Sequence, residues 1–190
     1  MPMIRYCLTA FCAFLLASLL TGCAAPGGSV AEKRSNMMAM HDKVLADLYR
    51  MTPHAKQMVT SARGYGVFSN AQLKLFVAAA GTGNGVVVDN HTSKRTYMKM
   101  GEAGVGLGLG LKDFRVVFAF HTEKALTNFV EFGWQVAAEA DAAAKAADKG
   151  KEISRGITIG DVTIFQMTES GLALQATLKG VKYWKDPELN

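Results

Sequence analysis

Few side chains in this 190-residue sequence have the spacing that enzymatic chemistry requires. Its four histidines, at positions 41, 54, 91 and 121, are scattered and lack the spacing of metal ligands. His121 precedes Thr122 and Glu123 and could act as a lone base, but a histidine there is more often a strand-end residue. No Gly-x-Ser-x-Gly or Walker sequence is present. We therefore expect a protein without a catalytic site, a metal or a cofactor.

The residue with the clearest expected chemistry is Cys23. It follows an apolar run, residues 6–20, that is too short for a comfortable membrane span and has the layout of a secretory signal. The four residues Leu20-Thr21-Gly22-Cys23 resemble the lipobox of bacterial lipoproteins. This resemblance implies cleavage before Cys23 and acylation of its thiol and its new amine. The alternatives are an ordinary signal peptide with a chance cysteine, or an uncleaved anchor.

Cysteine usage agrees with export. Cys7 and Cys12 lie in the expected signal peptide, residues 1–22, so the exported chain would keep only Cys23 and form no internal disulfide. Its stability must then come from a hydrophobic core. Ala24 rather than aspartate follows the cysteine, and in bacteria with two membranes the resemblance implies sorting to the outer membrane, facing the periplasm.

Five basic side chains are candidates for binding anionic lipid headgroups. They are Lys74, Lys94, Arg95, Lys99 and Lys112. A basic cluster near a membrane is attracted by about 1 kcal/mol per charge. The alternative is that these are solvated turn residues and edge-strand residues that discourage edge pairing. The net charge of +5 fits an anionic membrane surface or simple solvation, and is too diffuse for nucleic acid.

The elements that must position these residues are organised around the stretch from Gly101 to Phe132. Glycines at positions 104, 106, 108 and 110 alternate with valine and leucine, which predicts a strand with one bare face. A membrane helix with Gly-x-x-x-Gly spacing is the alternative, but charged residues bound the apolar run 103–111, which is too short to span. After a turn at Lys112-Asp113, residues 114–120 are apolar on both faces, as expected of a strand between two layers.

Helices are expected on both sides of this centre. Thr122 predicts the N-cap of a helix from Glu123 to about Val130. An amphipathic helix is expected at 31–51, with a methionine-rich face that packs on the sheet or, alternatively, touches lipid or a partner. Thr52-Pro53 should open a second helix that reaches about residue 62 and ends at Gly64 and Gly66.

The remaining segments read mainly as strands and turns. Strands are predicted from Val67, at 73–80, 86–89, 95–100, 161–168 and 172–178, with turns at 81–85 and 90–94. A further strand could form at 133–140, and residues 141–150 could be a loop or a short helix. In a tail from residue 180, Tyr183 and Trp184 are expected to cover the core. The predicted strands and helices do not alternate as repeated βαβ units, and this order indicates an α+β fold.

From about His54 to Tyr183 the order of motifs resembles the SYLF domain. The matching pieces are Ala62-Arg63-Gly64-Tyr65-Gly66-Val67-Phe68, Leu73-Lys74 leading to Gly81-x-Gly83-x-Gly85-Val86, Gly104-Val105-Gly106-Leu107-Gly108, Val116-Val117, Thr122-Glu123-Lys124-Ala125-Leu126-x-x-Phe129, Ala138-Glu139-Ala140-Asp141-Ala142 and Ser170-Gly171-Leu172. The resemblance implies a non-enzymatic lipid-binding module. In eukaryotic proteins the family is linked to phosphoinositide membranes and actin regulation, and in bacteria it occurs as exported lipoproteins.

The same resemblance implies a layered antiparallel β-sandwich with a groove and flanking helices. Lys74 is the strongest candidate for lipid contact because it lies in the matching Leu-Lys segment. Ser69 replaces the proline that usually follows the Phe, and the residues near Tyr97 lack the usual Trp-to-Pro pattern; both departures concern the ligand more than the fold. The expected organisation is a tether at 23–30, a helical segment at 31–62, a SYLF-like domain at 63–184 and a tail at 185–190.

These observations together predict a membrane-anchored periplasmic lipoprotein whose SYLF-like domain binds lipid, with an anionic phospholipid as the expected ligand. The alternative is a structural or protein-interaction module of the envelope without lipid selectivity. Such a module would hold its partner through the methionine-rich helix or an open sheet edge.

Overall fold

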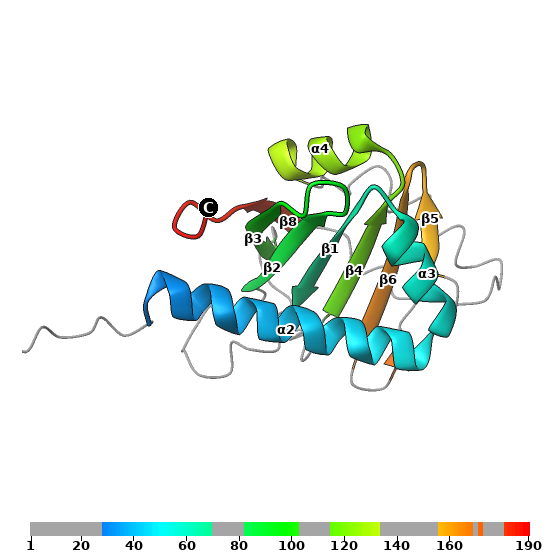
Figure 1. The fold of residues 1–190 in the computed structure, drawn as a ribbon, viewed down its shortest axis with the longest axis horizontal. Coiled ribbons are helices and arrows are strands. Elements are labelled where there is room, and N and C mark those ends of the chain that lie inside the picture. Colours follow the sequence, from blue (N-terminus) through cyan, green and yellow to red (C-terminus); the bar gives the residue numbers. More distant parts are fainter. Residues whose placement is uncertain (1–27, 70–81, 103–114, 134–155, 169–170, 173–180) are drawn as a thin grey trace, which may run out of the picture.

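An antiparallel sheet with helices on both faces forms the part of the chain that the computed structural model describes, residues 28–69, 82–102, 115–133, 156–168, 171–172 and 181–190 (Figure 1). The helices are α2 (Val30–Met51), α3 (Pro53–Ser61) and α4 (Glu123–Phe132). The strands are β1 (Gly64–Ser69), β2 (Thr82–Asp89), β3 (Arg95–Glu102), β4 (Arg115–Phe120), β5 (Ile157–Ile159), β6 (Val162–Thr168), β7 (Gly171–Leu172) and β8 (Val181–Lys185). Among the described residues, no helix is both long enough and apolar enough to cross a membrane.

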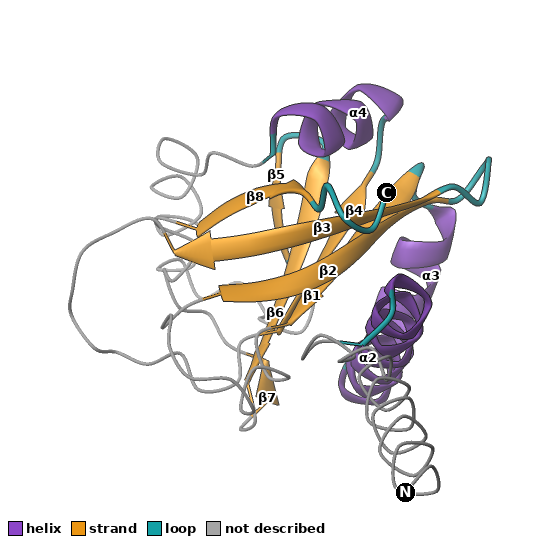
Figure 2. Ribbon diagram, turned by 90° about the vertical axis from the view of Figure 1, so that its left-hand side faces the viewer, coloured by secondary structure: helices purple, strands orange, loops and turns teal. Residues whose placement is uncertain are grey.

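The sheet is a single, strongly curled layer. Its strand order is β5-β6-β4-β1-β2-β3-β8, with β7 paired to β6, and every pair is antiparallel (Figure 2). The predicted α+β class, antiparallel pairing and flanking helices are confirmed. The predicted sandwich is not what the described strands form, because helices rather than a second sheet cover both faces of this layer.

Local signals position the helices as the sequence predicts. The Ser29 hydroxyl caps α2 by accepting a hydrogen bond from the Glu32 N–H at 3.1 Å. The Thr122 hydroxyl caps α4 in the same way, from the Ala125 N–H at 3.2 Å. Thr52 precedes α3, but its buried hydroxyl has no hydrogen-bond partner in the described residues, so Pro53 alone marks that start.

Helices α2 and α3 cover one face of the sheet. The methionine-rich face of α2, including Met37, Met40 and Leu48, is buried against the valines of the central strands. The prediction that this face packs on the sheet is therefore confirmed. Met37 and Met40 are at most 7% exposed, so the protein itself covers most of their surface.

An aromatic cluster fills the opposite face, beneath α4. Its members are Phe68, Phe118, Phe120, Phe129 and Tyr183, with ring centroids 4.8 to 6.1 Å apart in the contacting pairs. On β4, Phe118 and Phe120 enter this cluster while Val117 packs beneath the other helices. The predicted strand between two layers is thus confirmed.

Glycines in the first two strands make room for these rings. The sequence predicted that Gly64 and Gly66 would end a helix and that residues 81–85 would form a turn, and both predictions are wrong: the two glycines lie in β1, and β2 begins at Thr82. Gly85 pairs with Phe68 across the strands, and a Cβ built on Gly85 would collide with the Phe68 ring. These glycines therefore serve packing rather than turning.

The segment from residue 181 was also misassigned, because it forms β8 rather than an irregular tail. Tyr183 is buried as predicted, but Trp184 is 43% exposed because successive strand residues point to opposite faces. Strand β5 was not predicted. The bare-faced strand at 104–110, the turn at 112–113 and the predicted elements at 73–80, 134–150 and 173–178 lie outside the described residues.

Replacing Tyr183 with phenylalanine should raise the free energy of unfolding by about 1 kcal/mol. Burial raises the pKa of the Tyr183 phenol, and its hydroxyl has no hydrogen-bond partner among the described residues. Tyr65→Phe is the matched control and should destabilise, because the Tyr65 hydroxyl lies 3.0 Å from His41 Nε2. Urea unfolding of both variants measures whether each substitution raises or lowers the free energy of unfolding. A loss of stability in Tyr183→Phe would contradict the expectation.

Candidate functional site

The three predicted basic residues that the structure describes do not line one common cavity. Lys74 and Lys112 lie outside the described residues. Lys94, in the turn between β2 and β3, lines a hollow of about 240 Å³ beneath α4. Arg95 begins β3 on the other face of the sheet, where its charge acts on the phenol of Tyr65. Lys99 lies further along β3 on the same face as Arg95, so Lys94 lies apart from the other two cations.

Lys99 borders the larger cavity described, a groove of about 360 Å³. The groove lies between the first half of α2, the neighbouring ends of β1 to β3, and the C-terminal turn at residues 186–190. Met37, Met40 and Leu189 form an apolar wall, and Ser69 and Asn84 supply polar groups. A concave site with an apolar wall and a few polar groups is the usual form of a small-ligand site.

The rim of this groove carries both signs of charge. Lys33 Nζ lies 2.6 Å from Glu188 Oε1, and Lys99 Nζ lies 3.5 Å from Asp186 Oδ1. Asp186 also accepts a hydrogen bond from the Glu188 N–H at 2.9 Å. Lys99 is therefore a partly compensated cation rather than the free one that the sequence suggested. Two ammonium groups and two carboxylates suit a ligand with both charges as well as an anion.

The C-terminal turn closes one side of the groove and is fixed from both directions. The guanidinium of Arg34 donates two hydrogen bonds to the Leu189 carbonyl, at 2.9 and 2.7 Å, and lies 5.5 Å from the centre of the Tyr97 ring. The Asn190 side chain accepts from the Tyr97 N–H at 2.9 Å and donates to the Tyr97 carbonyl at 2.8 Å. These contacts hold the C-terminal turn in place, so it forms a fixed wall of the groove.

Sequence reasoning missed this groove, because it treated residues 185–190 as a tail. Its walls come from opposite ends of the chain, and nothing in the local pattern connects them. The turn-forming residues Asp186-Pro187 and the polar Asn190 were the available signals, and they indicate a turn without showing where it lies.

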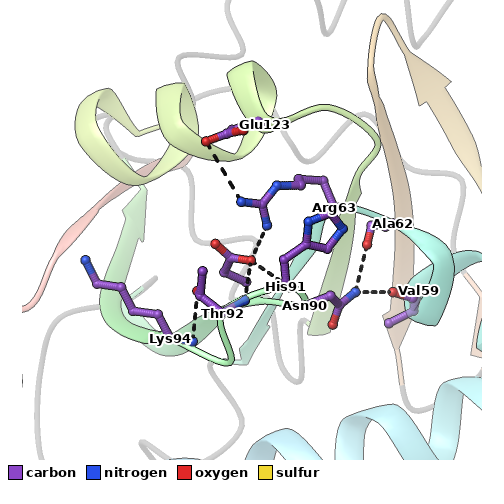
Figure 3. A network of polar contacts seen from close by, with 9 residues as sticks. Val59, Ala62, Arg63, Asn90, His91, Thr92, Lys94 and Glu123 are labelled. Atoms are coloured by element: carbon purple, nitrogen blue, oxygen red, sulfur yellow. Dashed lines mark hydrogen bonds and ion pairs between the residues drawn. The ribbon is translucent and has the colours of Figure 1, made fainter.

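The turn that carries Lys94 is held rigidly by a network centred on Asp89 (Figure 3). The Asp89 carboxylate pairs with Arg63 and accepts hydrogen bonds from the N–H groups of His91 and Thr92, at 2.8 and 3.2 Å. Asn90 Nδ2 donates to the carbonyls at the end of α3, at 3.0 and 2.9 Å. This network fixes the hairpin against α3 and the start of β1.

The electrostatics of Asp89 follow from these contacts. Burial alone would raise the pKa of this carboxyl, but the hydrogen bonds from Arg63, His91 and Thr92 outweigh that effect and hold the pKa well below its usual range. Asp89 therefore stays ionised and acts as a structural anion. We assign no ligand to it, because its Oδ1 already accepts from Arg63, His91 and Thr92.

Two of the four histidines, His41 and His121, have side-chain hydrogen-bond partners. His41 Nδ1 lies 2.8 Å from Asp42 Oδ1, and its Nε2 lies 3.0 Å from the Tyr65 hydroxyl. Burial, together with the nearby phenol of Tyr65, raises the pKa of Tyr49 to about 12. His121 Nε2 lies 2.8 Å from Thr163 Oγ1. Within the ranges described, no group of three or more histidine, cysteine or acidic residues is arranged to hold a metal ion.

Comparison with known proteins gives one informative similarity. The chain is 36% identical over 161 residues to Beta cell expansion factor A of Aeromonas veronii. The match covers 83% of this chain and 59% of that protein, so the chain spans just under three fifths of its relative's length. No family model matches the sequence.

Proposed function

We propose that this chain is an envelope lipoprotein, anchored by an acylated Cys23, whose SYLF-like domain binds lipid in the groove beside α2. The observation that carries the proposal is the pairing of an apolar wall with a charged rim in one groove. A headgroup would meet Lys33, Lys99 and the facing carboxylates, and the adjoining chain atoms would lie on Met37 and Met40. The sequence resemblance to the SYLF domain supports the same function.

The signal segment and the lipobox-like residues support a location at the outer membrane, facing the periplasm. Each acyl chain on Cys23 would add about 0.8 kcal/mol per buried methylene. Because the anchor keeps the domain near lipid at a high local concentration, even a weak groove would be occupied. The proposed ligand is a phospholipid, an anionic one being the first to test.

A protein-interaction role is the second candidate, but the described contacts reduce its support. The methionine-rich face of α2 is buried, and Asn190 and Asp186 bind the edge of β3 beyond the end of β8. The helix face and the exposed stretch of β3 are therefore already occupied by the protein itself, which leaves, in the described sheet, the outer edges of β5 and β8 for such a role.

Flotation of soluble protein starting at Ala24 with neutral and anionic vesicles tests lipid binding. Lys33→Glu should weaken binding about tenfold, because it places a second carboxylate beside Glu188 and reverses one rim charge. Lys43→Glu is the matched control, since Lys43 is an exposed lysine of the same helix that does not line the groove. Its binding should not change.

Circular dichroism and thermal unfolding show whether each variant is folded. Folded wild-type protein that floats with no vesicle composition would disprove lipid binding by the domain. Equal losses in the two lysine variants would instead show that binding depends on overall charge and not on the groove.

A further inference from the structure

The large apolar side chains that are exposed in the described residues gather at one end of the domain. They are Val30, Phe132 and Trp184, with exposed fractions of 38%, 77% and 43%. Val30 begins α2, Phe132 ends α4 and Trp184 lies in β8. Figure 1 shows the start of α2, the end of α4 and the C-terminus toward the left of the molecule, and Figure 2 looks onto that end.

Direct contacts join two of these elements. Lys185 Nζ lies 2.8 and 2.9 Å from the two carboxylate oxygens of Glu131, which connects β8 to the last turn of α4. Gly133 ends α4 with a φ of +70°, and a Cβ built there would collide with the Tyr183 carbonyl. The end of α4, with Phe132, therefore lies beside the edge strand β8, while Trp184 points to the opposite face of β8 from Tyr183.

The same end of the domain also contains the groove and the start of α2. Trp184 is the cross-strand partner of Lys99, so the two side chains share the face of the sheet that the groove occupies. The C-terminal turn, which follows β8, is joined to α2 by the Lys33–Glu188 pair. Trp184, the groove and the start of α2 therefore lie on one face at this end of the domain, with Phe132 beyond the edge strand β8.

The length of the tether determines which part of the domain stays near the proposed anchor. Seven residues, 23–29, connect the start of α2 to Cys23 and include it. Seven residues reach about 25 Å at most when fully extended. An acyl chain on Cys23 would therefore keep this end of the domain close to the bilayer and leave the opposite end, with α3, free to point away (Figure 1).

We propose that this end is the membrane-facing surface of the anchored domain, with the rings of Trp184 and Phe132 entering the interfacial layer of a phospholipid bilayer. The inference rests on the proposed acylation of Cys23. Tryptophan favours this layer because its ring is apolar and its N–H can bond to headgroups or water. In this orientation the groove beside Trp184 opens toward the lipid that it is proposed to bind.

Charge has a secondary role at this surface. Lys33, Lys99 and Lys185 are each paired with a carboxylate, whereas Lys182 is exposed and has no ion pair in the described part of the chain. Outside the groove, this surface therefore offers little unpaired charge to anionic lipid, and the rings supply most of its contact with the bilayer. The contribution of the rings should depend only weakly on salt.

The test uses the full acylated protein, purified from membranes and reconstituted into phosphatidylcholine–phosphatidylglycerol vesicles. The chain has two tryptophans, so Trp134→Phe leaves Trp184 as the sole tryptophan emitter. We expect the emission of Trp184 to shift to shorter wavelength. We also expect lipids brominated near the glycerol end of the acyl chain to quench this emission. A dye on Thr60→Cys, in α3 at the far end, should not be quenched.

A second measurement keeps the test independent of spectroscopy. In soluble protein starting at Ala24, Trp184→Ala should raise the apparent Kd for the vesicles about tenfold, while Trp184→Phe should retain part of the affinity. Circular dichroism confirms that both variants are folded. Unchanged affinity in folded Trp184→Ala would overturn the proposal.

The experiments distinguish an error in the proposed membrane-facing surface from an error in the proposed acylation of Cys23. Mass spectrometry of the N-terminal peptide reports acylation of Cys23, and an unmodified thiol contradicts the proposed anchoring. An acylated protein whose Trp184 emission is neither shifted nor quenched retains the anchor but disproves the orientation. A photo-crosslinker at position 184 that captures an envelope protein, with no lipid quenching, also overturns the proposal and assigns the surface to a protein partner.

Discussion

Replacing Gly85 with alanine should lower the free energy of unfolding by about 3 kcal/mol. A Cβ at this position would overlap the Phe68 ring and the Val67 carbonyl on the neighbouring strand. Phe68 is fully buried and lies in the centre of the aromatic cluster, so it cannot move without displacing Phe118 or Tyr183. Urea unfolding monitored by circular dichroism measures the loss.

The control is Gly160→Ala, which separates steric overlap from backbone strain. Gly160 has a φ of +55° and open space around its Cα, so alanine there should cost only about 1 kcal/mol. Phe68→Leu shrinks the obstructing side chain, and Gly85→Ala should cost less in that background than in the wild type. The close approach of the ring would be disproved if Gly85→Ala proved no more costly than Gly160→Ala.

Replacing Asp89 with asparagine should lower the free energy of unfolding by about 3 kcal/mol at pH 7, because Arg63 would keep its charge in a largely buried site. The exposed fractions of the Arg63 and Asp89 side chains are only 15% and 19%. Glu123→Gln is the control on the same guanidinium. Glu123 is 76% exposed and 3.9 Å from Arg63, so its loss should cost about 0.5 kcal/mol or less.

The pH dependence distinguishes this ion pair from a packing effect. The folded protein holds the pKa of Asp89 below its unfolded value, so the stabilisation is present above the usual carboxyl pKa of about 4. It is lost progressively as the pH falls from about 5 toward the lower folded pKa. The difference between wild type and Asp89→Asn should therefore shrink in this range, and a difference that stays constant from pH 7 to pH 3 would contradict the assignment.

Local features of this fold were predictable from sequence because their causes are local. The cap at Thr122 and the proline at position 53 mark helix starts through neighbouring residues, and the alternation along residues 115–120 reveals a strand with two buried faces. The methionine face of α2 was likewise expected to pack. Each of these signals depends on residues within two turns of helix or one strand.

The misassigned segments depend on partners far away in the chain. Gly85 resembles a turn residue until the Phe68 ring is placed over it, and residues 181–185 resemble a tail until β3 supplies their hydrogen-bond partners. For the candidate site, the sequence indicated Lys99 but not its carboxylate partner at position 186 or the groove between them.

The clamp between α2 and the C-terminal turn has a consequence for the order of folding. Lys33 and Arg34 bind Glu188 and Leu189, residues 155 positions away, so these contacts form only after almost the whole chain is available. In the export that we propose, residues 186–190 cross the membrane after α2, so the groove can form only once they have crossed.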